Sequence, residues 1–455
     1  MIKNLIATYL RMEVRDMKKT IKKSVGLVMA LALLTGLLAG CSNNGGNNSY
    51  DNESADGVVN IDFWGGWNGS DLGVMEEIVE QFNNSQDNVH VTLTTFSWSD
   101  MFSKLVTEYA DGVPCDILGL HPFEIGQYAE MGLYNPEPVV ELGLDESDYS
   151  EVVWDATFYE GVQYAVPLDS HMHGIFYNKA LFEEYGITKV PETGDELVET
   201  AIQLTVDANG LHPDETGFDP DNIVQYGLGM GMNHHLLFQF QTLMCQQGEE
   251  PFTVDMTEAD FDDEKAEKAF TWLQDLVFKY HVAPLGETSY SDDFVNGTVA
   301  MAIGGSWDVP KIQSSDIDWG VTLYPQVFDD ERAYWAAAHM LVFPSSKNPD
   351  KDKVDAAVQF ASWLTENLQL WADAGYVPSS KQMESYVAQD ENISVWLEAM
   401  DYAHYMPAHP KASQLFNQSA PSPFVTAYSS LILDGEDPAE VVRQFKADLN
   451  QILQE

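Results

Sequence analysis

The acidic and imidazole side chains between residues 168 and 187 form the most distinctive group of potential reactive or ligating residues in the sequence. This stretch, LDSHMHGIFYNKALFEEYGI, places Asp169, His171 and His173 at alternate positions. Alternate residues of an extended segment share one face, so these groups could converge on a metal ion. No further metal-ligating residue lies nearby in the sequence, and the adjacent His234 and His235 would point apart on a helix. Contact with a ligand in a cleft is therefore favoured, with a hydrogen-bonded structural pair as the alternative.

Motifs for bond chemistry are missing from the sequence. The chain contains 72 Asp and Glu residues, so carboxylate pairs arise at any spacing by chance and do not indicate a glycosidase. Neither a Gly-x-Ser-x-Gly elbow, nor a phosphate-binding Gly-x-x-x-x-Gly-Lys loop, nor a His-Glu-x-x-His helix occurs. We expect a protein that is not an enzyme and has no cofactor, with a secreted hydrolase as an alternative from another class.

Several tryptophans stand at the ends of apolar runs or beside glycine-rich turns. Trp64 and Trp67 lie in FWGGWNG, Trp98 in FSWSD, Trp307 in IGGSWDVP and Trp335 in YWAAAHM. Indole faces contact C–H surfaces, while neighbouring Asp, Glu, Asn and His side chains can bind hydroxyl groups. Taken together, these residues favour an uncharged polar ligand such as a sugar. Carboxylates beside aromatic faces would also suit a cationic ligand such as a polyamine.

The length and charge of the chain restrict its class. With 455 residues it exceeds the size of most single hydrophobic cores, so two globular bodies are expected. The formal net charge of −50 excludes a typical nucleic-acid-binding protein, which needs clustered Lys and Arg. Such an acidic surface suits an extracellular protein in a saline or alkaline medium, where salt screens self-repulsion.

The N-terminal segment has the features of an export signal. From Met17 it reads MKKTIKKSVGLVMALALLTGLLAGC, a basic start followed by an apolar core and the small residues before Cys41. The Leu-Ala-Gly-Cys ending resembles the lipobox of bacterial lipoproteins, which predicts a lipid anchor on Cys41. We expect residues 1–40 to be the signal peptide, with a true start at Met17, and the polar residues 41–57 to be a flexible tether.

Hydrophobic periodicity predicts a β-α-β-α-β succession at the start of the folded part. Its strands are VVNIDFW, VHVTLTTF and CDILGL, which favour a mainly parallel sheet covered by helices. The loops after these strands, residues 64–68, 96–100 and 121–124, should lie where such sheets bind ligands. Later segments predict helices at 194–206, 235–247, 262–280, 349–366 and 438–453, and strands at VAMAIGG, WGVTLYP and AAHMLVFP.

An ordered set of motifs runs from Val58 toward the C-terminus. It consists of FWGGW, PCDILGL with IGQYAEMGLY, GVQYAVPLDSHMHGIFYNKALFEEYGI, DDFVNGTVAMAIGGSWDVP, WGVTLYPQ, LVFPSSKNPDKDKVDAAVQFASWLT and ADAGYVPSSKQ. This set resembles the extracellular solute-binding lipoproteins of bacterial ABC importers, in the family that includes maltose-binding and other carbohydrate-binding proteins.

The resemblance implies an α/β fold with two lobes, joined by hinge crossings, that close on a ligand between them. The N-terminal lobe would comprise residues 58–169 and 340–375, and the C-terminal lobe residues 170–339 and 376–455. Cys115 and Cys245 would then lie in different lobes, and we expect both to be buried free thiols, with a disulfide between them as the alternative. The implied partners are a small-molecule ligand and a separate membrane permease, with no nucleic acid, and the protein would be a monomer.

Ligand contacts are assigned from the loop positions and from the resemblance. Asp169 and His171 should face the ligand, whereas His173 should serve packing or the hinge. The first loop has no basic residue, which disfavours a phosphorylated ligand. Metal capture and a cationic ligand remain alternatives to a sugar. The complete set of predicted contacts is Trp64, Trp67, His121, Glu124, Asp169, His171, His234, Phe238, Trp307 and Trp335.

Overall fold

A computed structural model describes residues 57–112, 114–231, 235–286, 289–416 and 422–455. These residues belong to one compact unit, which extends from Ser54 to Glu455. The predicted signal peptide, most of the tether and the predicted lipid attachment site at Cys41 lie outside the described residues. Within the described part of the chain, no helix is both long enough and apolar enough to cross a membrane.

The first sheet contains the β-α-β-α-β unit that the hydrophobic periodicity predicts. Two strands from later in the chain complete it, in the order β2-β1-β3-β13-β6, and β13 is antiparallel to both of its neighbours, β3 and β6. The parallel strands are β1 (Val59–Gly65), β2 (Val89–Thr95) and β3 (Ile117–Leu120), connected through α2 (Leu72–Ser85) and α3 (Trp98–Asp111). The added strands are β6 (Val166–Pro167) and β13 (Met340–Val342).

Both faces of this sheet are buried. Phe63 of β1 packs with Phe82 of α2 and Phe360 of α13 (Lys351–Glu366) on one face. The next residue, Trp64, packs with Phe102 of α3 on the other face. A parallel sheet covered by helices is typically apolar on both sides. This burial fixes the carboxyl ends of β1 and β3, and with them the loops that follow.

The second sheet has eight strands in the order β15-β12-β7-β10-β9-β8, with β11 and β14 also paired to β7. Its central strand is β7 (Asp169–Asn178), which is antiparallel to β10, β11, β12 and β14. The other strands are β8 (Val206–Asp207), β9 (Ile223–Met230), β10 (Val299–Gly305), β11 (Trp319–Leu323), β12 (Tyr334–Ala337), β14 (Val377–Pro378) and β15 (Ala403–Tyr405). A separate hairpin joins β4 (Phe158–Tyr159) and β5 (Val162–Gln163).

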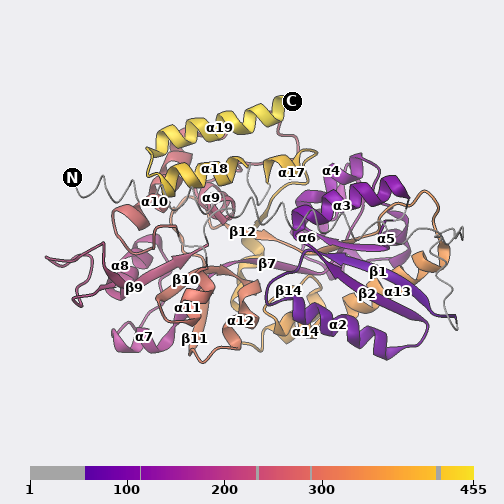
Figure 1. Ribbon diagram of the computed structural model, residues 1–455, viewed down its shortest axis with the longest axis horizontal. Helices are drawn as coiled ribbons and strands as arrows, with labels where there is room; N and C mark the ends of the chain where they lie inside the picture. Colours follow the sequence, from indigo (N-terminus) through magenta and orange to yellow (C-terminus); the bar gives the residue numbers. More distant parts are fainter. Residues whose placement is uncertain (1–56, 113, 232–234, 287–288, 417–421) are drawn as a thin grey trace, which may run out of the picture. The chain divides into compact units, whose positions relative to one another are not determined.

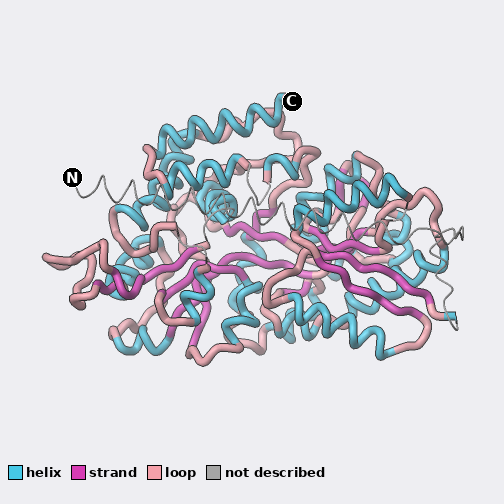
Figure 2. The backbone as a smooth tube through the Cα atoms, in the orientation of Figure 1, coloured by secondary structure: helices cyan, strands magenta, loops and turns pink. Residues whose placement is uncertain are grey.

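Helices flank the strands of both sheets (Figure 2). The C-terminal α19 (Pro438–Gln454) runs along α18 (Pro423–Tyr428) and packs against α10 (Asp263–Phe278) (Figure 1). The remaining helices are α4 (Ile125–Glu130), α5 (Glu137–Leu142), α6 (Glu151–Asp155), α7 (Lys179–Glu184), α8 (Gly194–Leu204), α9 (His235–Cys245), α11 (Tyr290–Val295), α12 (Val309–Gln313), α14 (Gln369–Asp373), α15 (Glu384–Val387), α16 (Val395–Ala399) and α17 (Ala412–Leu415).

The chain crosses between the two sheets at neighbouring points. It passes from β6 to β7 through Leu168 and returns from β12 to β13 through residues 338–339. The Leu168 backbone N–H donates to the His339 carbonyl over 2.9 Å, and the Ser379 N–H donates to the Leu168 carbonyl over 3.0 Å. Three chain segments therefore lie side by side between the sheets, which is the arrangement expected of hinge crossings.

Most of the predicted elements match the observed ones. Cys115 and Cys245 are buried free thiols, as predicted. The predicted strand AAHMLVFP is interrupted, because the His339 N–H donates to the Asp169 carboxylate over 2.9 Å instead of to a strand neighbour. The lobe limits, 58–169 with 340–375 and 170–339 with 376–455, stay predictions.

Candidate ligand-binding cleft

A cavity of about 380 Å³ lies where loops of the first sheet, loops of the second sheet and the crossing segments meet. The loop after β1, the start of α3 and the loop after β3 contribute from one side. The segment after β10 and the start of α9 contribute from the other. The lining residues are Gly66, Trp67, Asn68, Gly69, Ser70, Asp71, Trp98, His121, Phe123, His171, His235, Phe238, Ser291, Trp307, Asp308, Lys311, Trp335, Ala337, His339 and Tyr376.

Asp169 is the centre of a buried hydrogen-bond network behind this cavity. Its carboxylate pairs with Nδ1 of His171 at 3.0 Å and Nδ1 of His339 at 2.7 Å, and it accepts from Nε1 of Trp371 at 2.6 Å. An ionised carboxylate can only accept hydrogen bonds, so both imidazoles carry their proton on Nδ1. Their Nε2 atoms are therefore left with a free lone pair.

Burial and hydrogen bonding set the charge states of this network. Burial raises the pKa of Asp169, but the attraction to His339 and the hydrogen bonds from both imidazoles outweigh it, so the pKa lies below its usual value. Burial, reinforced by His339, lowers the pKa of His171 to about 4. Burial likewise lowers the pKa of His339, against the opposing effect of Asp169. At neutral pH the network is one carboxylate with two neutral imidazoles.

His121 has a similar arrangement with a second carboxylate. Its Nδ1 lies 3.5 Å from Oε2 of Glu124, and its backbone N–H donates to the same oxygen over 2.9 Å. The 3.5 Å separation is too long for a good hydrogen bond. Both residues are buried, and only His121 lines the cavity.

Two indoles in the cavity wall keep part of their surface exposed. Trp98 lies over the His339 ring, with centroids 5.7 Å apart and planes at 17°. Trp307 meets the His171 ring edge-on at 5.7 Å. Both are partly exposed, whereas Trp67 is 1% exposed and Trp335 is 2% exposed. Trp98 and Trp307 are therefore the indoles with surface left for a ligand.

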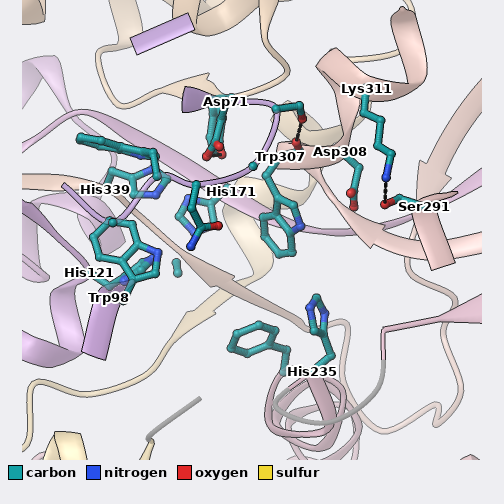
Figure 3. A pocket seen from close by; sticks show the side chains of 18 of the residues that line it. Asp71, Trp98, His121, His171, His235, Ser291, Trp307, Asp308, Lys311 and His339 are labelled. Carbon is teal, nitrogen blue, oxygen red and sulfur yellow. Dashed lines mark hydrogen bonds between the residues drawn. The ribbon is translucent and has the colours of Figure 1, made fainter. Parts of the chain in front are cut away.

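Polar groups lie on both sides of the cavity. Figure 3 shows Trp307, Asp308 and Lys311 on one side, with Trp98, His121 and His339 on the other. Burial raises the pKa of Asp308 to about 6, although Tyr290 donates a hydrogen bond to it over 2.7 Å. Burial also raises the pKa of Asp71, which accepts a hydrogen bond from Tyr376 over 2.9 Å. The cavity thus offers hydroxyl-binding groups beside apolar ring faces.

The structure brings most of the predicted contact residues to the cavity. Their role in binding stays a prediction, but their positions are clear. Trp67, His121, His171, Phe238, Trp307 and Trp335 line the cavity.

The remaining predicted residues lie elsewhere. Asp169 and Glu124 are buried behind the histidines that they contact and do not line the cavity. Trp64 points to the far face of the first sheet, where Lys104 lies 5.1 Å from the ring centroid. The direction of its side chain follows from strand alternation, because Phe63 occupies the opposite face. His234 lies outside the described residues, while its neighbour His235 lines the cavity.

Several cavity residues were not among the predicted contacts. Trp98 carried a usable signal in the sequence, since it is an aromatic residue that follows shortly after the end of a strand. His339 is a polar residue inside an apolar run, which was an available but weaker signal. Lys311 comes from a helix far from the predicted loops, and it is paired with Asp292 at 2.5 Å. Other residues missed are Asn68, Ser70, Asp71, His235, Ser291, Asp308 and Tyr376.

Two groups of described residues have the types and spacing of metal ligands. His121, His171 and His339 offer one ring nitrogen each, within 4.8 Å of one another. Cys245, Glu250 and His404 form a second such group, in which Glu250 and His404 are more exposed.

Comparison with known proteins identifies the family. The family model for the bacterial extracellular solute-binding protein matches residues 77–401. The maltotriose-binding protein of Pyrococcus abyssi is 23% identical over 371 residues, which cover 79% of this chain and 75% of the relative. The mannitol-binding protein of Pseudomonas aeruginosa is 24% identical over 369 residues, which cover 75% of this chain and 79% of the relative.

Solved structures share the fold. The maltose/maltodextrin-binding domain from Bdellovibrio bacteriovorus, bound to maltotriose, has a TM-score of 0.73 at 20% identity and covers 87% of this chain and 100% of that chain. The ABC substrate-binding protein from Listeria monocytogenes in complex with cycloalternan has a TM-score of 0.72 at 21% identity and covers 87% and 98%. These likenesses confirm the two-lobed α/β fold with a cleft between the lobes. The chain belongs to the bacterial extracellular solute-binding protein family.

Proposed function

We propose that this protein captures a small saccharide or polyol in the cleft between its lobes and delivers it to a separate ABC permease. The observation that carries the proposal is the pairing of the partly exposed indoles Trp98 and Trp307 with buried hydrogen-bonding groups in one cavity. Sugar rings have apolar C–H faces and hydroxyl edges, so a site for them needs both kinds of contact.

The size and charge of the cavity support a small neutral ligand. Its volume of about 380 Å³ lies near the lower end of the range for ligand pockets, roughly 300–1,000 Å³. The carboxyls Asp71 and Asp308 can accept hydrogen bonds from hydroxyls. Nε2 of His171 and Nε2 of His339 are further acceptors, because Asp169 holds the proton on the other nitrogen of each ring. The names of the relatives, which include maltotriose-binding and mannitol-binding proteins, agree with this class.

A cationic ligand is the second candidate. Asp71 and Asp308 line the same cavity as the aromatic rings, and a carboxylate beside an aromatic face is suited to an amine. Two observations count against a cationic ligand. Burial raises the pKa of both carboxyls, which favours their uncharged form. Lys311 places a cation at the same wall, which would repel an amine. A neutral ligand therefore fits better.

The cellular setting proposed for this function follows from the N-terminal sequence. A lipid on Cys41 would hold the protein at the outer face of the cell membrane, with residues 41–57 as a tether. Tethering keeps the binding protein close to the permease and raises its effective concentration there.

A thermal-shift screen of saccharides, polyols, polyamines and divalent metals tests the proposed ligand class. A ligand that binds the native state raises the melting temperature, and a saccharide or polyol should be the hit. Calorimetry on Trp98→Ala and Trp307→Ala should then show affinity lowered about tenfold or more, because each loses an aromatic contact.

Trp363→Ala is the matched control for these variants. Trp363 is also partly exposed but packs on Phe82 and does not line the cavity. Its removal should leave ligand affinity unchanged. Stabilisation by spermidine with no response to any saccharide or polyol would refute the proposed ligand class in favour of a cation.

A further inference from the structure

The three histidines of the cavity come from separate parts of the chain but converge at one point. His121 follows β3, His171 belongs to β7 and His339 lies in the crossing before β13. The ring centroids of His171 and His339 are 4.6 Å apart, and those of His121 and His339 are 5.3 Å apart. One ring nitrogen of each lies within 4.8 Å of the others. Figure 3 shows the three rings on one side of the pocket.

Each of these rings has a carboxylate behind its Nδ1 atom. Asp169 lies 3.0 Å from Nδ1 of His171 and 2.7 Å from Nδ1 of His339. Glu124 lies 3.5 Å from Nδ1 of His121, which has no hydrogen-bond partner although it is buried. A carboxylate hydrogen-bonded to one ring nitrogen fixes the tautomer and increases the basicity of the other, as behind histidine ligands of metal sites, and His171 and His339 have this arrangement.

The position of the three rings at the cavity wall also suits a metal site. The three residues are almost enclosed, with exposed fractions of 7% for His121, 4% for His171 and 4% for His339. They still line the cavity, so an ion could enter from the cleft.

We propose that His121, His171 and His339 bind a divalent transition-metal ion such as Zn²⁺, with a fourth position open to the cleft. Neutral imidazoles favour Zn²⁺, Ni²⁺ and Cu²⁺ over Mg²⁺ and Ca²⁺, which prefer oxygen ligands. Tetrahedral bonds of about 2.1 Å place ligand nitrogens about 3.4 Å apart, so the rings draw together on binding. The open position would take water or a donor atom of the bound ligand. This site does not depend on the ligand being a saccharide. With the ion bound, the Nε2 atoms of His171 and His339 would contact the metal instead of accepting hydrogen bonds from hydroxyls.

The second group of metal-ligand types is less suited to an ion. Burial and the neighbouring carboxylate of Glu250 raise the pKa of the Cys245 thiol well above its usual value. A thiol must lose its proton to become a good metal ligand. His404 Nδ1 is also paired directly with Glu250, which is itself one of the three candidate ligands of this group, whereas Asp169 is not a candidate ligand of the first group. Cys245, Glu250 and His404 therefore serve as the comparison group in the metal-binding experiment.

Cobalt binding tests the proposal on the folded protein after treatment with a chelator and removal of that chelator. Co²⁺ is the probe because its visible spectrum reports tetrahedral coordination, and Zn²⁺ calorimetry gives the stoichiometry. We expect one equivalent of metal, displacement of Co²⁺ by Zn²⁺, and a higher melting temperature with Zn²⁺. His171→Ala and His339→Ala should each weaken binding by more than about 100-fold, since removing a ligand costs more than removing its hydrogen-bond partner.

Further variants distinguish the loss of a metal ligand from the loss of the fold. His121→Ala leaves the partners of Asp169 intact and should also lose the metal, so the test survives if His171→Ala fails to fold. His90→Ala removes an exposed histidine of β2, and Cys245→Ser removes the thiol of the second group; both should bind metal as the wild type does. Absence of saturable Co²⁺ or Zn²⁺ binding overturns the proposal, as does binding that persists without His121 and His171. Saccharide binding that remains intact in that case would leave the proposed transport function standing.

Discussion

Asp169 shows how one buried carboxylate can organise a binding site from behind. It has no exposed surface, and its oxygens accept from the imidazoles of His171 and His339 and from the indole of Trp371. These bonds offset the desolvation of the charge and fix which imidazole nitrogen faces the cavity. The residue that orients the site is thus distinct from the residues that line it.

The low pKa of His171 predicts a specific pH dependence of stability. Its pKa is about 4 in the folded protein and near 6.5 in the unfolded chain, so unfolding takes up a proton between these values. The stability that the neutral His171 contributes to the folded protein is fully present above pH 6.5 and is lost as the pH falls to about 4. It amounts to about 3 kcal/mol, from about 1.4 kcal/mol for each pKa unit. Urea unfolding of the wild type and His171→Gln, measured across this range, should show a shallower slope for the variant.

His90→Gln provides the comparison for that experiment. His90 is exposed in β2, so its replacement should leave the pH dependence of the free energy of unfolding as in the wild type. Equal slopes for the wild type and His171→Gln would contradict the assigned pKa. Asp169 affects the free energy of unfolding over a lower pH range than His171. Its lowered pKa adds stability that is lost only as the pH falls below about 4.

At the scale of elements, the site depends on how loops and crossings are held. Trp98 is the first residue of α3, whose N-cap Ser97 accepts a hydrogen bond from the Asp100 N–H over 3.2 Å. This cap fixes the direction of the helix and so the position of the indole. Tyr376 follows Gly375 at the third segment between the sheets, where the chain leaves α14 for β14.

Gly375 gives a test of this crossing segment. It has φ of +95°, and an added Cβ would lie 2.6 Å from the Val309 side chain and 2.8 Å from the Ser306 carbonyl. Gly375→Ala should lower the free energy of unfolding by about 2–4 kcal/mol, from backbone strain together with overpacking. Because Tyr376 lines the cavity, ligand affinity should fall as well. Urea unfolding and calorimetry measure the two effects.

Gly132→Ala separates strain from overpacking. Gly132 has φ of +71° and no heavy atom within 4 Å of an added Cβ, so only the backbone strain of about 1–2 kcal/mol should remain. Equal losses in the two variants would show that the contact with Val309 and Ser306 does not matter.

At the scale of the whole molecule, charge is the dominant property. The chain has 72 acidic and 22 basic residues, and most ion pairs among the described residues, such as Lys351 with Asp355, are at the surface. Surface ion pairs stabilise little, so they do not offset the repulsion among the excess carboxylates. The fold must tolerate this repulsion through its buried cores.

This charge predicts stabilisation by salt. Raising NaCl from about 0.1 M to about 1 M shortens the Debye length from about 10 Å to about 3 Å and should raise the melting temperature at pH 7.5. The effect should diminish near the pI of about 4.2, where the net charge vanishes. Differential scanning calorimetry at both pH values measures it. A melting temperature that is unchanged or lower in 1 M NaCl at pH 7.5 would show that self-repulsion is not limiting.

The fold could largely be predicted from local sequence patterns. Alternating residues of β1 and the apolar stripes of α2 and α3 are short-range signals, and the parallel sheet follows from their order. The interruption at His339 could not be predicted, because it depends on a hydrogen bond to Asp169, far away in the sequence. Aromatic residues at strand ends likewise indicated a cleft from local sequence alone.

The sequence by itself determined the acidic composition, the α/β succession and the aromatic residues at strand ends, all of which are local properties. Its ordered motifs indicated a two-lobed solute-binding protein through their resemblance to a known family. Only the tertiary structure decided which polar residues face the cleft. His171 lines it while Asp169 lies behind, although both stand on the same side of one strand. The difference arises because His339 and Trp371, both remote in sequence, enclose the Asp169 carboxylate with their N–H groups.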